Sequence, residues 1–294
     1  MRKPSPREVR LLIYVFVLGG VVAWKVSREW WAPDMVISTA HYRIQSAATR
    51  EETDKTGRAL ESLYMAYAEF LDDAGLSPNS HDRLQVKLFK DREEFRRVND
   101  VRGWAEAFYH EPFCYAYNAA GKPNPYHWML HEATHQLNSE VAGVDPEKWL
   151  EEGLATYFST RRIGREDLIM GETDTNTYPV WWLHKLATSG ELGTDKANGS
   201  VIPLRFIVSG SGGPDIDDAF NLYYLHWWTL THFLLHHEDG RYRGGVAKLL
   251  QNGSGVDAFE EHVGDIERIE QRWYEHVRVL KKLQKQTTPP VELH

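Results

Sequence analysis

The spacing of apolar side chains changes period several times between residues 40 and 126. Apolar residues recur every three or four positions from Thr49 to Gly75, which predicts one long amphipathic helix. Thr49 and Glu52 have the spacing of a capping box at its start, and a second helix is expected to open at Asp91. Short alternating runs predict three half-buried strands, at 41–45, 84–89 and 113–117.

Helical spacing dominates the remainder of the chain. Six further helices are predicted, at 149–161, 178–188, 217–237, 241–251, 256–263 and 265–285. The segments 164–177 and 208–215 lack this spacing and are predicted to be loops, and residues 286–294 are expected to be disordered. This order predicts the α+β class, in one domain over 40–285 with a small strand–helix lobe (40–126) before a mainly helical lobe (127–285).

The first 39 residues differ in composition from this domain. Basic residues in the segment 1–10 precede an apolar run, which predicts an uncleaved signal anchor over 11–26 and a short linker over 27–39. The uncharged part is shorter than the roughly 20 residues of a spanning helix, but Lys25 can snorkel and extend the span. The alternatives are a cleaved signal peptide, which would give a secreted protein, and a buried helix. The expected product is a single-pass membrane protein whose folded domain lies outside the cytoplasm.

Charge and cysteine content exclude some classes of function. The 294 residues carry a net charge of -8 and show no long basic stripe, so nucleic-acid binding is not expected. Cys114 is the single cysteine, which excludes disulfides within the chain and zinc sites built from several thiolates.

Two histidines with metal-binding spacing lie on another predicted helix, which Asn124 can cap and Pro125 can begin. His131 and His135 are four residues apart, so both imidazoles lie on one helix face and can reach a single metal ion. Glu132, next to the first histidine, completes a His-Glu-x-x-His motif. The pattern predicts a hydrolytic metal site if a third ligand comes from elsewhere.

A second motif downstream supplies that ligand. The run Glu152-Gly153-Leu154-Ala155 follows the histidine motif and, together with it, resembles the gluzincin superfamily of zinc peptidases. The resemblance implies Zn²⁺ bound by His131, His135 and Glu152, with Glu151 as the alternative third ligand. It also implies a zincin-like fold over about residues 40–280, with the metal between the two lobes. Gly153 is expected to let two helices approach closely, because it has no Cβ.

The resemblance also implies a catalytic role for individual residues. Zinc lowers the pKa of its bound water towards about 7, and Glu132 is placed to accept the water's proton as general base. Tyr224 is expected to donate a hydrogen bond to the oxyanion, with Tyr223 and His226 as alternatives. The Thr156 hydroxyl is expected to accept a hydrogen bond from a ligand histidine.

The other histidines of these helices are interpreted as structural. His127 lies one turn before His131, too far along the helix to share the same ion, and is expected to be at most an outer contact. His232 and His236 have ligand spacing but no accompanying carboxylate motif.

The predicted strand 113–117 has two interpretations. It is either the edge strand that pairs with an extended peptide, as in the family it resembles, or an internal strand that packs within the sheet.

Three functions are compatible with this sequence. The favoured hypothesis is a membrane-anchored zinc peptidase that acts on peptides or proteins outside the cytoplasm. The second is a non-catalytic binding or assembly protein of the envelope, with Trp181-Trp182 and Trp227-Trp228 forming partner surfaces instead of core. The third is a zinc hydrolase acting on a non-peptide amide.

Overall fold

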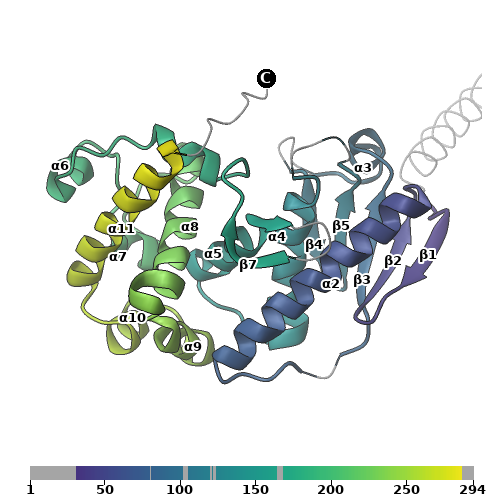
Figure 1. The fold of residues 1–294 in the computed structure, drawn as a ribbon, viewed down its shortest axis with the longest axis horizontal. Helices are drawn as coiled ribbons and strands as arrows, with labels where there is room; N and C mark the ends of the chain where they lie inside the picture. Colours follow the sequence, from purple (N-terminus) through teal and green to yellow (C-terminus); the bar gives the residue numbers. More distant parts are fainter. Residues whose placement is uncertain are drawn as a thin grey trace, which may run out of the picture.

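The chain forms a mixed α+β fold, with a five-stranded sheet towards the N-terminus and a mainly helical C-terminal part (Figure 1). The structure, a computed structural model of the chain, describes residues 31–79, 81–101, 105–119, 121, 124–163 and 168–286. Within these ranges no helix combines the length and apolar character that crossing a membrane requires. The predicted anchor at 11–26 and the tail 287–294 lie outside the described residues.

The sheet has the order β1-β2-β3-β5-β4, with parallel pairs in the centre and an antiparallel pair at each side. Its strands are β1 (Met35–Ser38), β2 (Tyr42–Ser46), β3 (Leu84–Phe89), β4 (Ala107–His110) and β5 (Phe113–Tyr117). The three predicted strands are confirmed. Strand β1 corrects the prediction of a linker over 27–39, and β4 was not predicted. Because β5 lies between β3 and β4, the edge interpretation of 113–117 is wrong, and β4 is the edge strand on that side of the sheet.

Helix α2 (Arg50–Asp73) confirms the long amphipathic helix and packs against the sheet and α4 (His127–Gln136). The capping box forms as predicted: the backbone N–H of Glu52 donates to Thr49 Oγ1 at 3.3 Å, and the Thr49 N–H donates to Glu52 Oε2 at 3.1 Å. Gly75, with φ +67°, follows the end of the helix. This helix therefore begins and ends where its sequence signals lie.

The two faces of β5 pack against different helices. Cys114 and Ala116 are buried, and the Cys114 thiol lies 3.8 Å from the Met129 carbonyl oxygen of α4. On the opposite face the ring of Tyr117 lies 5.8 Å from Phe95, which belongs to α3 (Arg92–Val98). The sheet thus forms a middle layer that supports α4 from one side.

Helix α4 begins two residues later than expected. Its N-cap is Tyr126, and the side chain of Asn124 instead accepts a hydrogen bond from the Tyr126 backbone N–H at 3.2 Å. Asn124 and Pro125 therefore form the turn before the helix. After Gln136 the helix continues as a π-helix over Leu137–Ala142, which ends at Gly143 with φ +64°.

The C-terminal part contains the predicted helices, with some differences. Its α-helices are α5 (Lys148–Ser159), α6 (Leu192–Ala197), α7 (Leu204–Ser209), α8 (Phe220–His236), α9 (Arg243–Asn252), α10 (Val256–His262) and α11 (Ile266–Gln286). The segment predicted as a helix at 178–188 is a 3₁₀ turn over Val180–Lys185. The predicted loop 164–177 is partly wrong, because β6 (Arg161–Ile163) pairs with β7 (Leu168–Thr173). Helix α7 likewise enters the predicted loop at 208–215.

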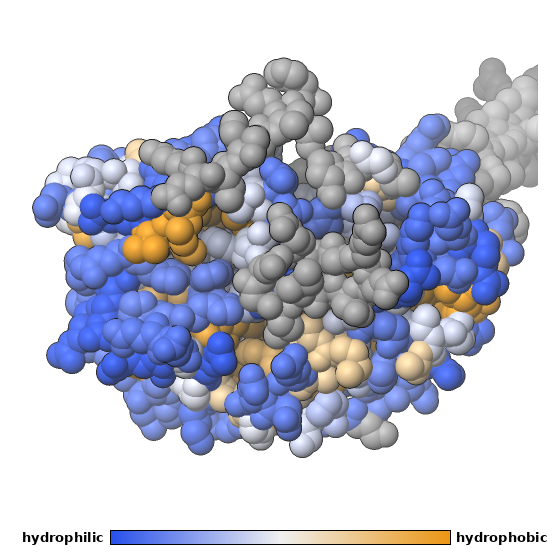
Figure 2. Space-filling view, viewed as in Figure 1, coloured by the Kyte–Doolittle hydropathy of each residue, from blue (hydrophilic) through white to orange (hydrophobic). Residues whose placement is uncertain are grey.

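The core is rich in aromatic side chains, and most of the face in Figure 2 is hydrophilic. Trp227 and Trp228 of α8 are buried, which confirms core packing for that pair and removes it as a partner surface. Trp181 and Trp182 are half-buried. Burial of these aromatic side chains therefore stabilises the helical part through the hydrophobic effect.

His226 connects α8 to the chain before α7. Its Nδ1 lies 2.7 Å from the Leu222 carbonyl oxygen, and its Nε2 accepts a hydrogen bond from the Ile202 N–H at 3.3 Å. The ring is only 2% exposed, and this burial lowers its pKa from 6.5 to about 4 despite the bond to Leu222. The folded protein therefore holds His226 in the neutral form.

We expect His226 to make folding sensitive to mild acid. Because its pKa is lowered on folding, its contribution is complete above pH 6.5 and is lost as pH falls towards 4. At pH 5 the loss for this residue is about 2 kcal/mol, from about 1.4 kcal/mol per pKa unit. Urea unfolding at pH 7.5 and pH 5 measures how much unfolding free energy is lost between the two pH values. This loss should be smaller in His226→Gln than in the wild type by the same amount.

The exposed His184 provides the control, and His184→Gln should keep the wild-type pH dependence. Equal pH dependence in His226→Gln and the wild type would contradict the assignment.

Candidate metal centre

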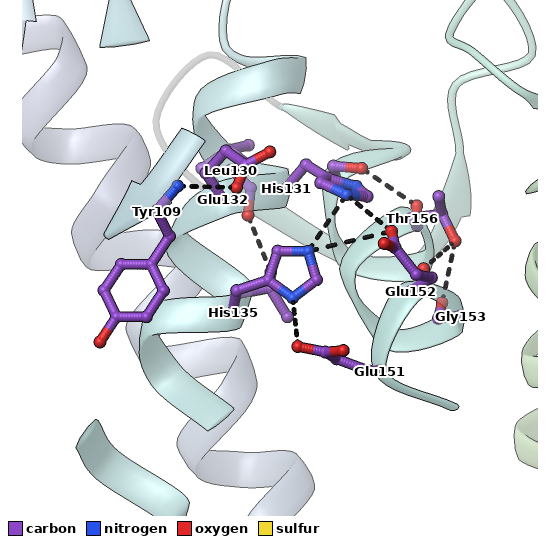
Figure 3. Close-up of polar contacts among 11 residues, drawn as sticks. Tyr109, Leu130, His131, Glu132, His135, Glu151, Glu152, Gly153 and Thr156 are labelled. Carbon is purple, nitrogen blue, oxygen red and sulfur yellow. Dashed lines mark hydrogen bonds and ion pairs between the residues drawn. The ribbon is translucent and has the colours of Figure 1, made fainter. Parts of the chain in front are cut away.

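Three side chains from α4 and α5 converge on one point (Figure 3). His131 Nε2 lies 3.3 Å from His135 Nε2 and 3.2 Å from Glu152 Oε2, and the third side of the triangle, His135 Nε2 to Glu152 Oε2, is 3.9 Å. The two helices pack side by side, so the sequence-predicted ligands are brought together across 17 to 21 positions of the chain. Among the described residues, His131, His135 and Glu152 form the group of three possible metal ligands whose ligand atoms lie close to one another.

The spacing of these atoms fits a metal ion. Ligands about 2.0–2.1 Å from a tetrahedral zinc lie about 3.3–3.4 Å apart, which two of the three distances match and the third exceeds by half an ångström. Glu152 Oε2 is buried and has no hydrogen-bond partner among the residues that the structure describes. Two neutral imidazole nitrogens and a carboxylate oxygen would direct lone pairs at one another, so the arrangement requires a shared proton or a cation.

The surrounding charges favour a cation at this point. Burial alone would raise the pKa of Glu152, but its contacts with His131 and His135 outweigh burial and lower it to about 2. Burial would likewise lower the pKa of His135, yet the carboxylates of Glu151, Glu132 and Glu152 raise it to about 9. Both shifts have the same cause, the attraction between the imidazoles and the carboxylates that surround them.

Glu151 occupies a different place from Glu152. Its Oε1 lies 3.2 Å from Nδ1 of His135, the ring nitrogen that points away from the convergence point. A carboxylate in this position orients a ligand histidine and increases its basicity. Of the two adjacent glutamates, Glu152 therefore faces the candidate ion and Glu151 supports a ligand.

The expected contact of Thr156 with a ligand histidine is not formed. Its hydroxyl donates within its own helix to the carbonyl oxygens of Glu152, at 2.6 Å, and Gly153, at 3.0 Å. Nδ1 of His131 is buried and has no hydrogen-bond partner among the described residues. A threonine hydroxyl in a helix readily donates to a backbone carbonyl three or four residues earlier, and this local hydrogen bond replaces the expected contact with another helix.

Glu132 projects from α4 towards the edge strand β4. Its Oε2 accepts a hydrogen bond from the Tyr109 backbone N–H at 2.9 Å (Figure 3). Glu132 is partly exposed to solvent. Its negative charge is one of those that raise the pKa of His135. The sequence predicted the carboxylate but not the backbone group that orients it.

Two tyrosines lie at the other side of the site. The ring of Tyr224 lies 6.2 Å from that of His131, and its hydroxyl interacts with Glu152; burial and then this carboxylate raise its pKa. The ring of Tyr178 lies 5.8 Å from that of Tyr224, and its buried hydroxyl has no hydrogen-bond partner in the described part of the chain. Burial, followed by the charge of Glu152, raises the pKa of Tyr178 as well. Both phenols stay protonated and can donate.

The two alternatives to Tyr224 lie elsewhere. The Tyr223 hydroxyl donates to the Pro214 carbonyl oxygen at 3.0 Å, on the side of the loop 210–215. His226 uses both ring nitrogens in the contacts with Leu222 and Ile202. Tyr178 is the site residue that the sequence did not reveal, since no spacing connects it with either motif.

The remaining histidines keep structural roles. His127 is buried, its Nδ1 lies 3.3 Å from the Ser159 carbonyl oxygen, and burial, then the charge of His131, lowers its pKa to about 3. Nδ1 of His232 lies 3.0 Å from His276 Nε2, and His236 bonds to the Tyr157 hydroxyl at 2.7 Å. None of them joins the convergence point.

Gly153 allows α5 to lie close against α8, as predicted. A Cβ at this position would overlap the Thr231 hydroxyl and lie 3.2 Å from the Trp227 carbonyl oxygen. Because Glu152 is the adjacent residue, this contact fixes how deeply the third carboxylate reaches towards the histidines.

A family model described as "Protein of unknown function (DUF1570)" matches residues 128–248. The matched segment contains both motifs and runs through α8, so all five predicted site residues lie inside it. No curated protein matches the chain.

We expect Gly153→Ala to destabilise the protein by about 1–3 kcal/mol, because the added methyl group has no space between α5 and α8. Thr231→Ala in the same chain should recover part of this loss by removing the obstructing hydroxyl. Gly193→Ala is the matched control, since nothing lies within 4 Å of a Cβ there and α6 gains helix propensity. Equal unfolding free energies for Gly153→Ala and Gly193→Ala would contradict the close contact between α5 and α8.

We expect the purified full chain to bind one zinc ion, and Glu152→Ala and His131→Ala to lose it, because each removes a converging ligand. Glu151→Gln should retain zinc with about 10- to 100-fold weaker affinity, as expected of an outer carboxylate. Elemental analysis and competition with a chelator measure both effects. The exposed Glu191→Gln is the control. Wild-type zinc affinity in Glu152→Ala would contradict the assignment of the third ligand.

Proposed function

We propose that the protein is a zinc-dependent peptidase of the gluzincin type, with zinc held by His131, His135 and Glu152. The observation that carries this proposal is the mutual spacing of the three ligand atoms beside a partly exposed glutamate in the sequence position of a general base. A sheet that supports a motif-bearing helix, followed by a helical part that contributes the third ligand, supports a zincin-like fold.

The residues around the ion then have separate tasks. Bound zinc would act as a Lewis acid on the scissile carbonyl and on water. Glu132, oriented by the Tyr109 N–H, accepts a proton from the attacking water and later delivers it to the leaving amine. Tyr224, protonated and beside Glu152, donates a hydrogen bond to the developing oxyanion, and Tyr178 is close enough to assist.

The edge strand β4 favours a peptide as the substrate. Its outer side has no neighbouring strand in the sheet, and it lies against α4 next to the base. An extended peptide could pair with β4 as an additional strand, which is the β-augmentation mode of recognition. Its backbone carbonyl groups would then lie next to the candidate metal centre. A small non-peptide amide would make no use of this edge.

The proposed cellular location rests on the sequence alone. The basic residues of 1–10 and the apolar run of 11–26 support a membrane anchor, with the peptidase domain outside the cytoplasm.

We expect the full chain loaded with zinc to cleave casein or a peptide library, and Glu132→Gln to reduce the cleavage rate at least about 100-fold while zinc content stays unchanged. The amide keeps the size of the carboxylate but cannot accept the proton. Mass spectrometry of the products measures the cleavage, and Glu191→Gln is again the control. Unchanged cleavage by Glu132→Gln would overturn the mechanism.

A non-catalytic binding protein of the envelope is the second candidate, and the half-buried pair Trp181 and Trp182 is the surface that favours it. That function would give stoichiometric zinc, no cleavage of any peptide by the wild type, and loss of partner binding when the two tryptophans are replaced.

A further inference from the structure

A cavity of about 310 Å³ lies where the ends of several helices meet, away from the candidate metal centre. Residues from α2, α5, α8 and α9 line it, and its inner wall is Arg161, directly after α5 and nine residues beyond Glu152. The cavity therefore sits where α2 of the strand–helix region meets the helical region.

Arg161 is an unusual residue to find buried without a counterion. It is 3% exposed, and its guanidinium lies 4.2 Å from the centre of the Tyr157 ring. Its Nη1 has no hydrogen-bond partner within the part of the chain that the structure describes. Among the described residues, no carboxylate forms an ion pair with it. Buried arginines are almost always paired, because an isolated charge loses its hydration. The burial lowers the pKa of Arg161 to about 10.

Other positive or donor groups face the same space. Arg243 lies at the rim and donates through Nε to the Leu235 carbonyl oxygen at 2.8 Å, which fixes the direction of its guanidinium. His236 is bonded to the Tyr157 hydroxyl, and burial together with Arg161 and Arg243 lowers its pKa to about 4. Two carboxylates of α2, Glu69 and Asp73, also line the cavity, and both are exposed to solvent. The charge of Glu69 partly offsets the effect of burial on the pKa of Arg161.

The C-terminal ends of α5 and α8 contribute partial negative charge near this cavity. That charge accounts for a cation in this place, but it leaves Nη1 of the guanidinium without an acceptor among the described residues. Planar guanidinium groups bind carboxylate and phosphate oxygens in pairs, which would satisfy both the charge and the donors.

We propose that this cavity is a binding site for a small anion carrying a phosphate or carboxylate group, held by Arg161 as the buried donor and Arg243 at the rim. The exposed Glu69 carboxylate attracts the same guanidinium and therefore opposes the binding of an anion. The cavity volume suits a small ligand, not a protein chain.

The test uses the full chain at constant ionic strength, with chloride replaced stepwise by inorganic phosphate in one arm and by acetate in the other. Calorimetry should detect saturable binding of at least one anion, and the arm that saturates identifies its class. Arg161→Met should weaken this binding at least tenfold, Glu69→Gln should strengthen it, and Arg205→Met, which removes an exposed arginine paired with Glu260 and Glu267, should leave it unchanged.

A second measurement on the wild type covers the case in which Arg161→Met does not fold. A bound anion adds negative charge beside His236, so NMR titration should show a higher pKa for this ring in the saturating anion than in chloride. No saturable binding of either anion, or equal binding by Arg161→Met, would overturn the proposal and leave Arg161 as a counter-charge to the helix ends. An unchanged His236 titration at saturation would do the same.

Discussion

The close contact between α5 and α8 at Gly153 is the constraint on which the candidate site depends. Helix α5 packs between α4 and α8, and its depth is set by the absence of a side chain where it meets Thr231 and Trp227. The neighbouring Glu152 then reaches the imidazoles of the other helix. The two imidazole nitrogens and the Glu152 oxygen are therefore brought together by helix packing at Gly153, outside the candidate site itself. The convergence is therefore a property of the whole three-helix arrangement.

Much of the fold could be predicted from the sequence, because the longest elements carry their own signals. The capping box at Thr49, the apolar period of α2 and the alternation in β3 each describe the local structure without help from the rest of the chain. The histidine pair could be placed for the same reason, since four residues make one turn of a helix. The adjacent Glu152 and Gly153 required the resemblance to a family as well.

The missed elements depend on tertiary contacts. Strands β1 and β4 have four residues each and form only at the sides of an existing sheet, and α6 and α7 have six residues, below the length at which a helix is stable alone. In the site, the sequence could not reveal Tyr178, which comes from a segment that follows no motif. Nor could it reveal that Thr156 would satisfy its hydroxyl within its own helix.

The hydrogen bond from Tyr109 to Glu132 has a consequence for the exposed side of the sheet. An open strand edge invites pairing with any extended chain, and proteins commonly protect such edges with charge. Here a carboxylate already occupies one of the outward N–H groups of β4. A chain that paired with β4 at Tyr109 would have to compete with Glu132 for this N–H. A peptide that pairs with the strand while Glu132 keeps its orientation would therefore use the other outward groups of β4.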